Sequence, residues 1–202
     1  YLPLRGRGTS LGAAVLRGHG IERSEPQLRD HAQALCDQLG LALQRALAAR
    51  PADAYLRYQL GKDFEVQSEF EAAAPHYLQA LAQVEARATW RHDLVLRTLF
   101  TLKKLGRFEP AMSIAEQEMP RWSESPDFWF TLGDLLLDWA ASAPERAGEL
   151  LPMIEASWLR AIEIGERPAL HDTVRGRGSF LAAHNLAVFH SSLGNAAEAA
   201  QW

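Results

Sequence analysis

The chain has 202 residues, of which 48% are hydrophobic, so it is long enough and apolar enough for one sizeable folded domain. Its formal net charge of -4 excludes a global attraction to nucleic acid or to an anionic membrane surface. Cys36 is the single cysteine, no apolar run reaches the roughly 20 residues that span a bilayer, and no signal-peptide pattern opens the chain, so we expect a soluble, cytoplasmic protein without internal disulfides.

The first segment, residues 1–23, holds too many glycines for a helix, although Ala13–Leu16 could form one short strand. We interpret it as an irregular segment, the tail of a preceding domain. The chain starts at Tyr1 without methionine and ends at Trp202 within an alanine-rich helical run. These two ends favour a piece of a longer protein.

Residues 24–50 have the pattern of one long amphipathic helix. Ser24 supplies a capping hydroxyl, Pro26 falls in the first turn, and Gln27 follows three residues after the serine. Leucines then recur at steps of three and four residues, which is typical of a helix that buries one face. We expect this helix to pack on the segment that follows it.

Four later segments are similar to one another, and they begin near residues 54, 92, 126 and 180. The first carries Leu60, Gly61 and Phe64 in one helical stretch, and Ala73 and Tyr77 in the next. The order of large and small residues is that of a repeat built from two helices. The last segment is truncated at the end of the chain, so its second helix is incomplete.

Small residues recur where the two helices of a pair would cross closely. Gly61 and Ala73 have this place in the first segment, and Gly133 and Ala161 have it in the third. The third segment matches only if it contains an insertion around residues 142–150, where its two helices turn.

This pattern resembles the tetratricopeptide repeat (TPR). The resemblance implies an all-α fold over residues 24–202, a right-handed solenoid of antiparallel helix pairs, or TPR-like superhelix. VLRGHGI at 15–21 and RGRGSFLAAHNLAVFHSSLGN at 175–195 add a second likeness. Together with the repeats they resemble the region after the catalytic domain in bacterial family 2 glycosyltransferases that carry TPRs.

The catalytic domains of those transferases hold a metal and a nucleotide sugar through an Asp-x-Asp pair, and this chain contains no Asp-x-Asp. The resemblance therefore implies a non-catalytic accessory part of a transferase, with no cofactor of its own. The Lys and Asn set by which some TPRs clamp a peptide carboxylate is also absent, because Asn185 stands alone.

The first helix of each pair lines the inner face of such a solenoid. Aromatic side chains with interspersed charges at those positions favour an extended peptide or a helix over a small polar substrate. We therefore predict a protein-interaction scaffold that binds a peptide or protein partner in the concave groove. The predicted groove residues are Tyr55, Tyr58, Lys62, Glu65, Leu96, Phe100, Lys104, Phe130, Asp134, His184 and Val188. Equivalent positions carry Val66, Asp93, Lys103, Asp127, Leu137, Asp138, Leu181, Ser191 and Ser192.

The run RGRGS at 175–179 admits two interpretations. In one, Arg175, Arg177 and Ser179 hold an anion at a helix start, so that the segment forms part of a transferase's acceptor or sugar-phosphate site. In the other, the glycines let the chain turn and Ser179 caps the helix. The run lacks the Lys-Ser/Thr ending and the preceding strand of a phosphate loop, which favours the hinge. A further alternative for the whole chain is an oligomerisation module in which the end helix stacks on a second copy.

The remaining reactive residues favour ordinary structural roles. No two histidines share a helical face at metal-binding spacing, so we predict no metal site. Cys36 lies among leucines without a neighbouring base, which predicts a small buried group. The carboxylates of the repeats are expected on solvated faces: Glu65, Glu69, Glu71, Glu116, Glu118, Glu124 and Asp127.

Overall fold

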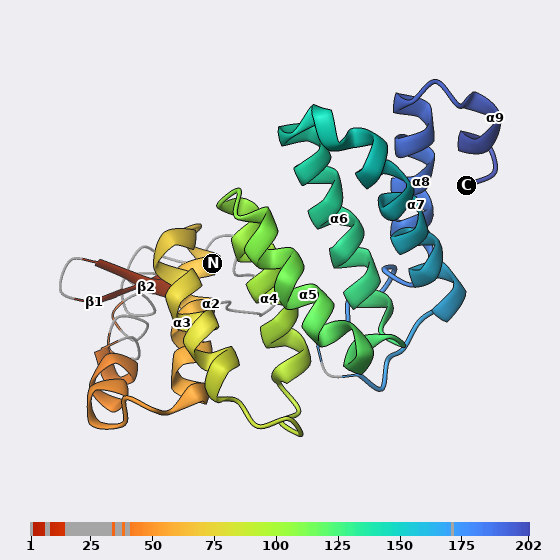
Figure 1. Cartoon of the computed structure of the whole chain (residues 1–202). Coiled ribbons are helices and arrows are strands. Elements are labelled where there is room, and N and C mark those ends of the chain that lie inside the picture. Colours follow the sequence, from red (N-terminus) through yellow and green to blue (C-terminus); the bar gives the residue numbers. More distant parts are fainter. Residues whose placement is uncertain (1, 7–8, 15–33, 35–37, 39–40, 171) are drawn as a thin grey trace, which may run out of the picture. The chain divides into compact units, whose positions relative to one another are not determined.

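The computed structural model describes residues 2–6, 9–14, 34, 38, 41–170 and 172–202. These residues are mainly α-helical, in agreement with the all-α class expected from the sequence (Figure 1). The chain divides into two compact units, Tyr1–Ala88 (unit 1) and Thr89–Trp202 (unit 2). This boundary differs from the one expected from the sequence, which separates residues 1–23 from a helical domain at 24–202. The N-terminal segment joins unit 1 because its second strand contacts helix α2.

The N-terminal segment contains a β-hairpin, which corrects the expectation of an irregular stretch. Strand β1, Leu2–Gly6, pairs antiparallel with strand β2, Thr9–Ala14. A hairpin is held by backbone hydrogen bonds, so it forms where glycines disfavour a helix. Residues 15–33, including the expected helix start, and Cys36 lie outside the described residues. Within the expected long helix, residues 34, 38 and 41–49 are helical.

The helix pair of unit 1 consists of α2, Ala54–Val66, and α3, Phe70–Gln83. The side chain of Asp53 caps α2 by accepting a hydrogen bond from the Leu56 N–H at 3.0 Å. A Cβ atom added at Gly61 would lie 2.5 Å from the ring of Tyr77 on α3. Glycine at this position therefore lets the buried Tyr77 ring lie directly against the backbone of α2.

Unit 2 contains α4, Arg91–Lys104; α5, Phe108–Trp122; α6, Pro126–Ser142; the 3₁₀ turn η2, Pro144–Arg146; α7, Ala147–Ile164; α8, Phe180–Ser192; and α9, Ala196–Ala199. Consecutive helices pack in pairs, α4 with α5, α6 with α7, and α8 with α9. The pairs also contact one another, because α4 and α5 both touch α6, and α7 touches α8. Within the described ranges, no helix is both long and apolar enough to span a membrane.

The α6–α7 pair has the same kind of close crossing as the pair of unit 1. A Cβ atom added at Gly133 would lie 2.5 Å from Nε1 of Trp158 on α7. Trp158 is 1% exposed, and Ala161 one turn further on is fully buried. The insertion expected around residues 142–150 is accommodated by longer helices, since α6 has 17 residues and α7 has 18, whereas α2 has 13.

A buried polar cluster in unit 2 corrects the expectation that Glu118 is solvated. Glu118 is 7% exposed, forms an ion pair with Arg91, and accepts a hydrogen bond from Nε1 of Trp122 at 3.1 Å. Beside it, Nε2 of His92 lies 2.7 Å from the Ser125 hydroxyl, whose oxygen caps α6. The Glu118 carboxylate can be buried because Arg91 from α4 neutralises its charge and Trp122 from its own helix donates a hydrogen bond to it.

Three helix connections share one backbone turn. A residue with positive φ follows α2, α4 and α8: Ser68 at 61°, Gly106 at 66° and Gly194 at 79°. The next residue in each case donates its N–H to a carbonyl in the last turns of the preceding helix, always at 2.9 Å: Glu69 to Phe64, Arg107 to Leu102, and Asn195 to His190. The three turn residues occupy the same place relative to the repeat starts at 54, 92 and 180.

Ser68 is the one residue of this set that carries a side chain in the left-handed region. Ser68→Gly is expected to raise the free energy of unfolding by about 0.5–1 kcal/mol, because relief of the strain exceeds the added freedom of the unfolded chain. Urea unfolding followed by circular dichroism measures the change. Gly106→Ala is the matched control and should destabilise the protein, so a stabilising Gly106→Ala or a destabilising Ser68→Gly contradicts the interpretation.

Candidate partner-binding face

The first helices of the three pairs in unit 2 contribute to one connected face. On α4, Nζ of Lys103 and Nζ of Lys104 lie 5.7 Å and 5.5 Å from the centre of the Phe100 ring. Lys103 also forms an ion pair with Asp138 of α6, with Nζ 3.2 Å from Oδ2. The Lys103 side chain is only 12% exposed, so its stem and charge are fixed between the two helices.

Asp134 is the centre of the face on α6. Its Oδ1 accepts a hydrogen bond from Nδ2 of Asn185 on α8 at 3.1 Å. Burial raises the pKa of the Asp134 carboxyl to about 6, and Lys103 and Arg177 nearby offset this only in part. The Trp158 side chain also lowers this pKa, and the neighbouring Asp138 carboxylate raises it.

Asp127 fixes the loop before α8 to the start of α6. It is 1% exposed, and its Oδ1 accepts hydrogen bonds from the Val174 N–H at 3.0 Å and from Nη1 of Arg177 at 3.1 Å. The Arg177 guanidinium also lies 5.4 Å from the centre of the Phe130 ring. The expectation that Asp127 is solvated is therefore wrong, because a loop distant in sequence covers it.

Exposed apolar side chains lie beside these polar groups. Leu137 is 38% exposed and follows Asp134 by three residues, and Val188 is 54% exposed and follows Asn185 by three residues. Helical spacing places each on the same side of its helix as its neighbour. We call this surface the α4–α6–α8 face, and it comprises Phe100, Lys103, Lys104, Phe130, Asp134, Leu137, Asp138, Arg177, His184, Asn185 and Val188.

The groove residues predicted from the sequence divide between the two units. Phe100, Lys104, Phe130, Asp134, His184 and Val188 belong to the α4–α6–α8 face, and Tyr55, Tyr58, Lys62 and Glu65 belong to α2 in unit 1. On α2, Nζ of Lys62 lies 5.1 Å from the centre of the Tyr58 ring, and the Tyr77 hydroxyl donates to Glu65 at 2.5 Å. Tyr55 is 49% exposed.

Two of the predicted groove residues are core residues. Tyr58 is 2% exposed and lies against Tyr77, with ring centres 6.5 Å apart. Leu96 is 5% exposed. Repeat position alone placed them in the groove, but the side chains are covered, so neither is available to a partner.

At the start of α8, where one interpretation of RGRGS places an anion, the chain's own carboxylate takes the donors. Oε1 of Glu166 accepts hydrogen bonds from the Gly176 N–H at 2.9 Å and from the Ser179 hydroxyl at 2.7 Å. Ser179 makes no side-chain cap of α8. Arg177 is paired with Asp127, and Arg175 is exposed. The donors expected for a phosphate thus hold the loop in place, which agrees with the turn of the hinge interpretation, whereas its expectation that the Ser179 side chain caps α8 is wrong.

Unit 1 contains a pocket of about 300 Å³ lined by Gln44, Leu47, Ala48, Leu60, Phe64 and His76. His76 stacks on Phe64, with ring centres 5.5 Å apart, and its buried Nδ1 has no hydrogen-bond partner among the described residues. Burial, and secondarily Arg57, lowers the pKa of His76. In the part of the chain that the structure describes, no three histidine, cysteine, aspartate or glutamate side chains gather as metal ligands do.

Sequence reasoning missed Glu166, which fixes the loop, and it did not anticipate that Asn185 pairs with Asp134. Comparison of the chain with protein-family models, with curated proteins and with solved structures finds no match.

The raised pKa of Asp134 makes stability depend on pH. The folded protein holds this proton up to about pH 6, whereas the unfolded chain releases it near the ordinary carboxyl pKa of 3.8, so stability should fall as the pH rises from about 4 to 6. Asp134→Asn keeps an acceptor for Asn185 and removes the titration. The melting temperature of Asp134→Asn relative to wild type should therefore be higher at pH 7 than at pH 4. If the difference in melting temperature between Asp134→Asn and wild type is the same at both pH values, Asp134 does not have a raised pKa.

Proposed function

We propose that the chain is a TPR-like protein-interaction module that binds a peptide segment of a partner protein along the α4–α6–α8 face. In this proposal the helix pairs form a right-handed solenoid, and the module is a non-catalytic accessory part of a glycosyltransferase-like protein. The accessory role is supported by the sequence resemblance alone.

The repeat is supported by two recurring features of the helix pairs. Gly61 meets the ring of Tyr77 in one pair, and Gly133 meets Trp158 in another, so a glycine on the first helix faces a large aromatic residue on the second. The positive-φ turn after α2, α4 and α8 recurs at the same repeat position. Close crossing by small residues and a fixed turn are what a stack of similar helix pairs requires.

The binding role is supported by the composition of the α4–α6–α8 face. Leu137 and Val188 are exposed apolar side chains, and the same face carries fixed charges beside the Phe100 and Phe130 rings. This combination of apolar anchors and positioned polar groups suits a peptide. The carboxylate of Glu166 occupies the loop donors, so no observation favours a sugar-phosphate site.

Peptides selected from a phage-displayed random library on the full chain provide the test. We expect the selected peptides to bind in fluorescence-anisotropy titrations, and the Leu137→Ser/Val188→Ser double variant to weaken binding about tenfold or more, as for hot-spot residues at an interface.

Leu78→Ser is the matched control, because Leu78 lies on α3 of unit 1 and is 37% exposed, against 38% for Leu137. It should leave the affinity unchanged. Failure to select any peptide, or selected peptides that bind the double variant as tightly as wild type, would overturn the proposal.

A further inference from the structure

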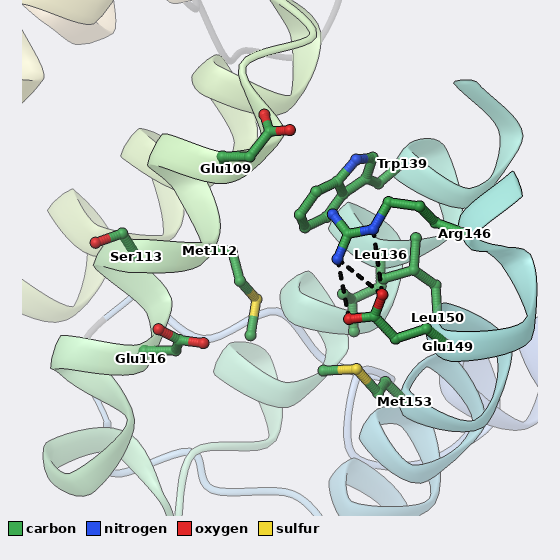
Figure 2. A pocket seen from close by; sticks show the side chains of 10 residues that line it. All are labelled: Glu109, Met112, Ser113, Glu116, Leu136, Trp139, Arg146, Glu149, Leu150 and Met153. Carbon is green, nitrogen blue, oxygen red and sulfur yellow. Dashed lines mark hydrogen bonds and ion pairs between the residues drawn. The ribbon is translucent and has the colours of Figure 1, made fainter. Parts of the chain in front are cut away.

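A pocket of unit 2 lies between α5, α6 and α7 (Figure 2). The pocket has a volume of about 320 Å³. Its floor is apolar, because Leu136 is fully buried, Leu150 is 1% exposed and Trp139 is 6% exposed. Leu136 and Trp139 lie on the side of α6 opposite Asp134, so the pocket is separate from the α4–α6–α8 face.

The rim of the pocket is acidic. Glu109 and Glu116 are exposed on α5, and Glu149 contributes a carboxylate from α7. Arg146 is the one basic residue among those that line the pocket. Arg146 pairs with Glu149. Among the described residues, Glu109 and Glu116 on the α5 side of the pocket form no ion pair. The pocket therefore favours a ligand with positive charge.

Arg146 shows how the pocket holds a cation. Its guanidinium carbon lies 4.1 Å from the centre of the Trp139 ring. Its nitrogens donate to both carboxylate oxygens of Glu149, at 2.9 to 3.2 Å. An indole face and a carboxylate thus bind the chain's own arginine on one wall, and the opposite wall offers Glu109 and Glu116 for a cation from elsewhere (Figure 2).

Methionines make the apolar part adaptable. Met112 from α5 and Met153 from α7 line the pocket, and they are two of the chain's three methionines. Figure 2 shows Met112 extending from α5 between the two walls. Met153 is 37% exposed. Flexible thioether side chains adjust to an inserted apolar group, as they do in sites that bind amphipathic helices.

We propose that this pocket docks a basic amphipathic helix of a partner protein. Glu109 and Glu116 are seven residues apart on α5, two helical turns, so two cations seven residues apart on a helix lying along α5 face them together. An apolar side chain of the helix, one turn after the first cation, enters between Met112 and Met153. The walls of this second docking surface come from α5 and α7 and its floor comes from α6, and the proposal does not depend on the function proposed for the α4–α6–α8 face.

The probe is a fluorescein-labelled alanine-based helical peptide with lysines seven residues apart and leucines three and four residues after the first lysine. The full chain should bind this peptide in anisotropy titrations, more weakly as salt rises. A peptide with glutamates in place of the lysines, and one with alanines in place of the leucines, should both bind at least about tenfold more weakly, since each lacks one of the two contacts.

The double variant Glu109→Gln/Glu116→Gln should weaken binding of the lysine peptide about tenfold. This is the loss expected when two lysine–carboxylate ion pairs at the upper end of their usual strength are removed. Glu85→Gln/Glu198→Gln is the matched control, because it removes the same charge from exposed positions outside the pocket. Circular dichroism should show all variants folded, since these side chains are exposed.

Three results would overturn the proposal: equal binding of the lysine and glutamate peptides, equal loss in both double variants, or no binding of the lysine peptide at all. The Leu137→Ser/Val188→Ser variant should bind the lysine peptide as wild type does. Loss of binding in that variant would assign the peptide to the α4–α6–α8 face and would likewise overturn the second site.

Discussion

Replacement of Trp158 by alanine is expected to lower the free energy of unfolding by about 3–5 kcal/mol, the range for truncation of a large buried aromatic side chain. Trp158 is 1% exposed, lies against the backbone of α6 at Gly133, and meets Phe189 of α8 edge to face with ring centres 6.0 Å apart. Its removal therefore leaves a cavity shared by three helices. Urea unfolding followed by circular dichroism measures the loss.

The reason for glycine at position 133 is tested by a double-mutant cycle with the same measurement. Gly133→Ala alone should destabilise the protein, because its Cβ atom would lie 2.5 Å from the indole of Trp158. In the Trp158→Ala background the same change should be neutral or stabilising, since alanine favours a helix by up to about 1 kcal/mol. Additive effects would show that Gly133 is not required by the indole.

Gly178→Ala is expected to lower the free energy of unfolding by about 2–3 kcal/mol, the upper range for overpacking. A Cβ atom at this position would lie 2.5 Å from both the carbonyl carbon and the carbonyl oxygen of Gly165. Backbone atoms cannot avoid the clash by a change of rotamer, as a side chain can. The loop before α8 must therefore move away from the end of α7. Thermal and urea unfolding both measure the effect.

Gly148→Ala is the matched control for this prediction. Gly148 is exposed in the first turn of α7, and nothing lies within 4 Å of a Cβ atom added there. Alanine should therefore stabilise α7 by up to about 1 kcal/mol. If both substitutions change stability in the same direction, the close contact between Gly178 and Gly165 does not hold the loop.

Local patterns in the sequence predicted the helices and their crossings well. Gly61 and Gly133 were expected at close approaches of two helices, and each lies against an aromatic ring of the next helix. Such positions are predictable because the spacing of small and large residues along a helix determines which side chains meet a neighbour. The α2, α4, α6 and α8 helices begin within one residue of 54, 92, 126 and 180.

The polar contacts were not predictable in the same way. Glu166 binds Gly176 and Ser179, and Asp127 binds Arg177, which is distant in sequence. These partners meet only after the loop folds back on the helices, and no local pattern indicates which carboxylate will reach which donor. The same reason explains Glu118, which was expected in solvent and is paired inside unit 2.

The burial of Tyr58 and Leu96 shows a further limit of reasoning from repeat position. Repeat position grouped both residues with polar positions of the first helices. A residue at the edge of such a stripe is exposed only if no neighbouring element packs over it. Tyr58 packs on Tyr77, so its side chain belongs to the interior.

The common turn after α2, α4 and α8 bears on how this chain could have grown. These turns lie inside the pairs, so a segment that runs from one turn to another, such as α3 with α4, takes one helix from each of two neighbouring pairs. Its duplication or deletion rejoins the chain at turns of the same backbone conformation, so the junctions stay compatible. The third pair connects α6 to α7 through η2 instead, and its extra helical turns interrupt the series. Recombination within that pair would have to supply a new junction.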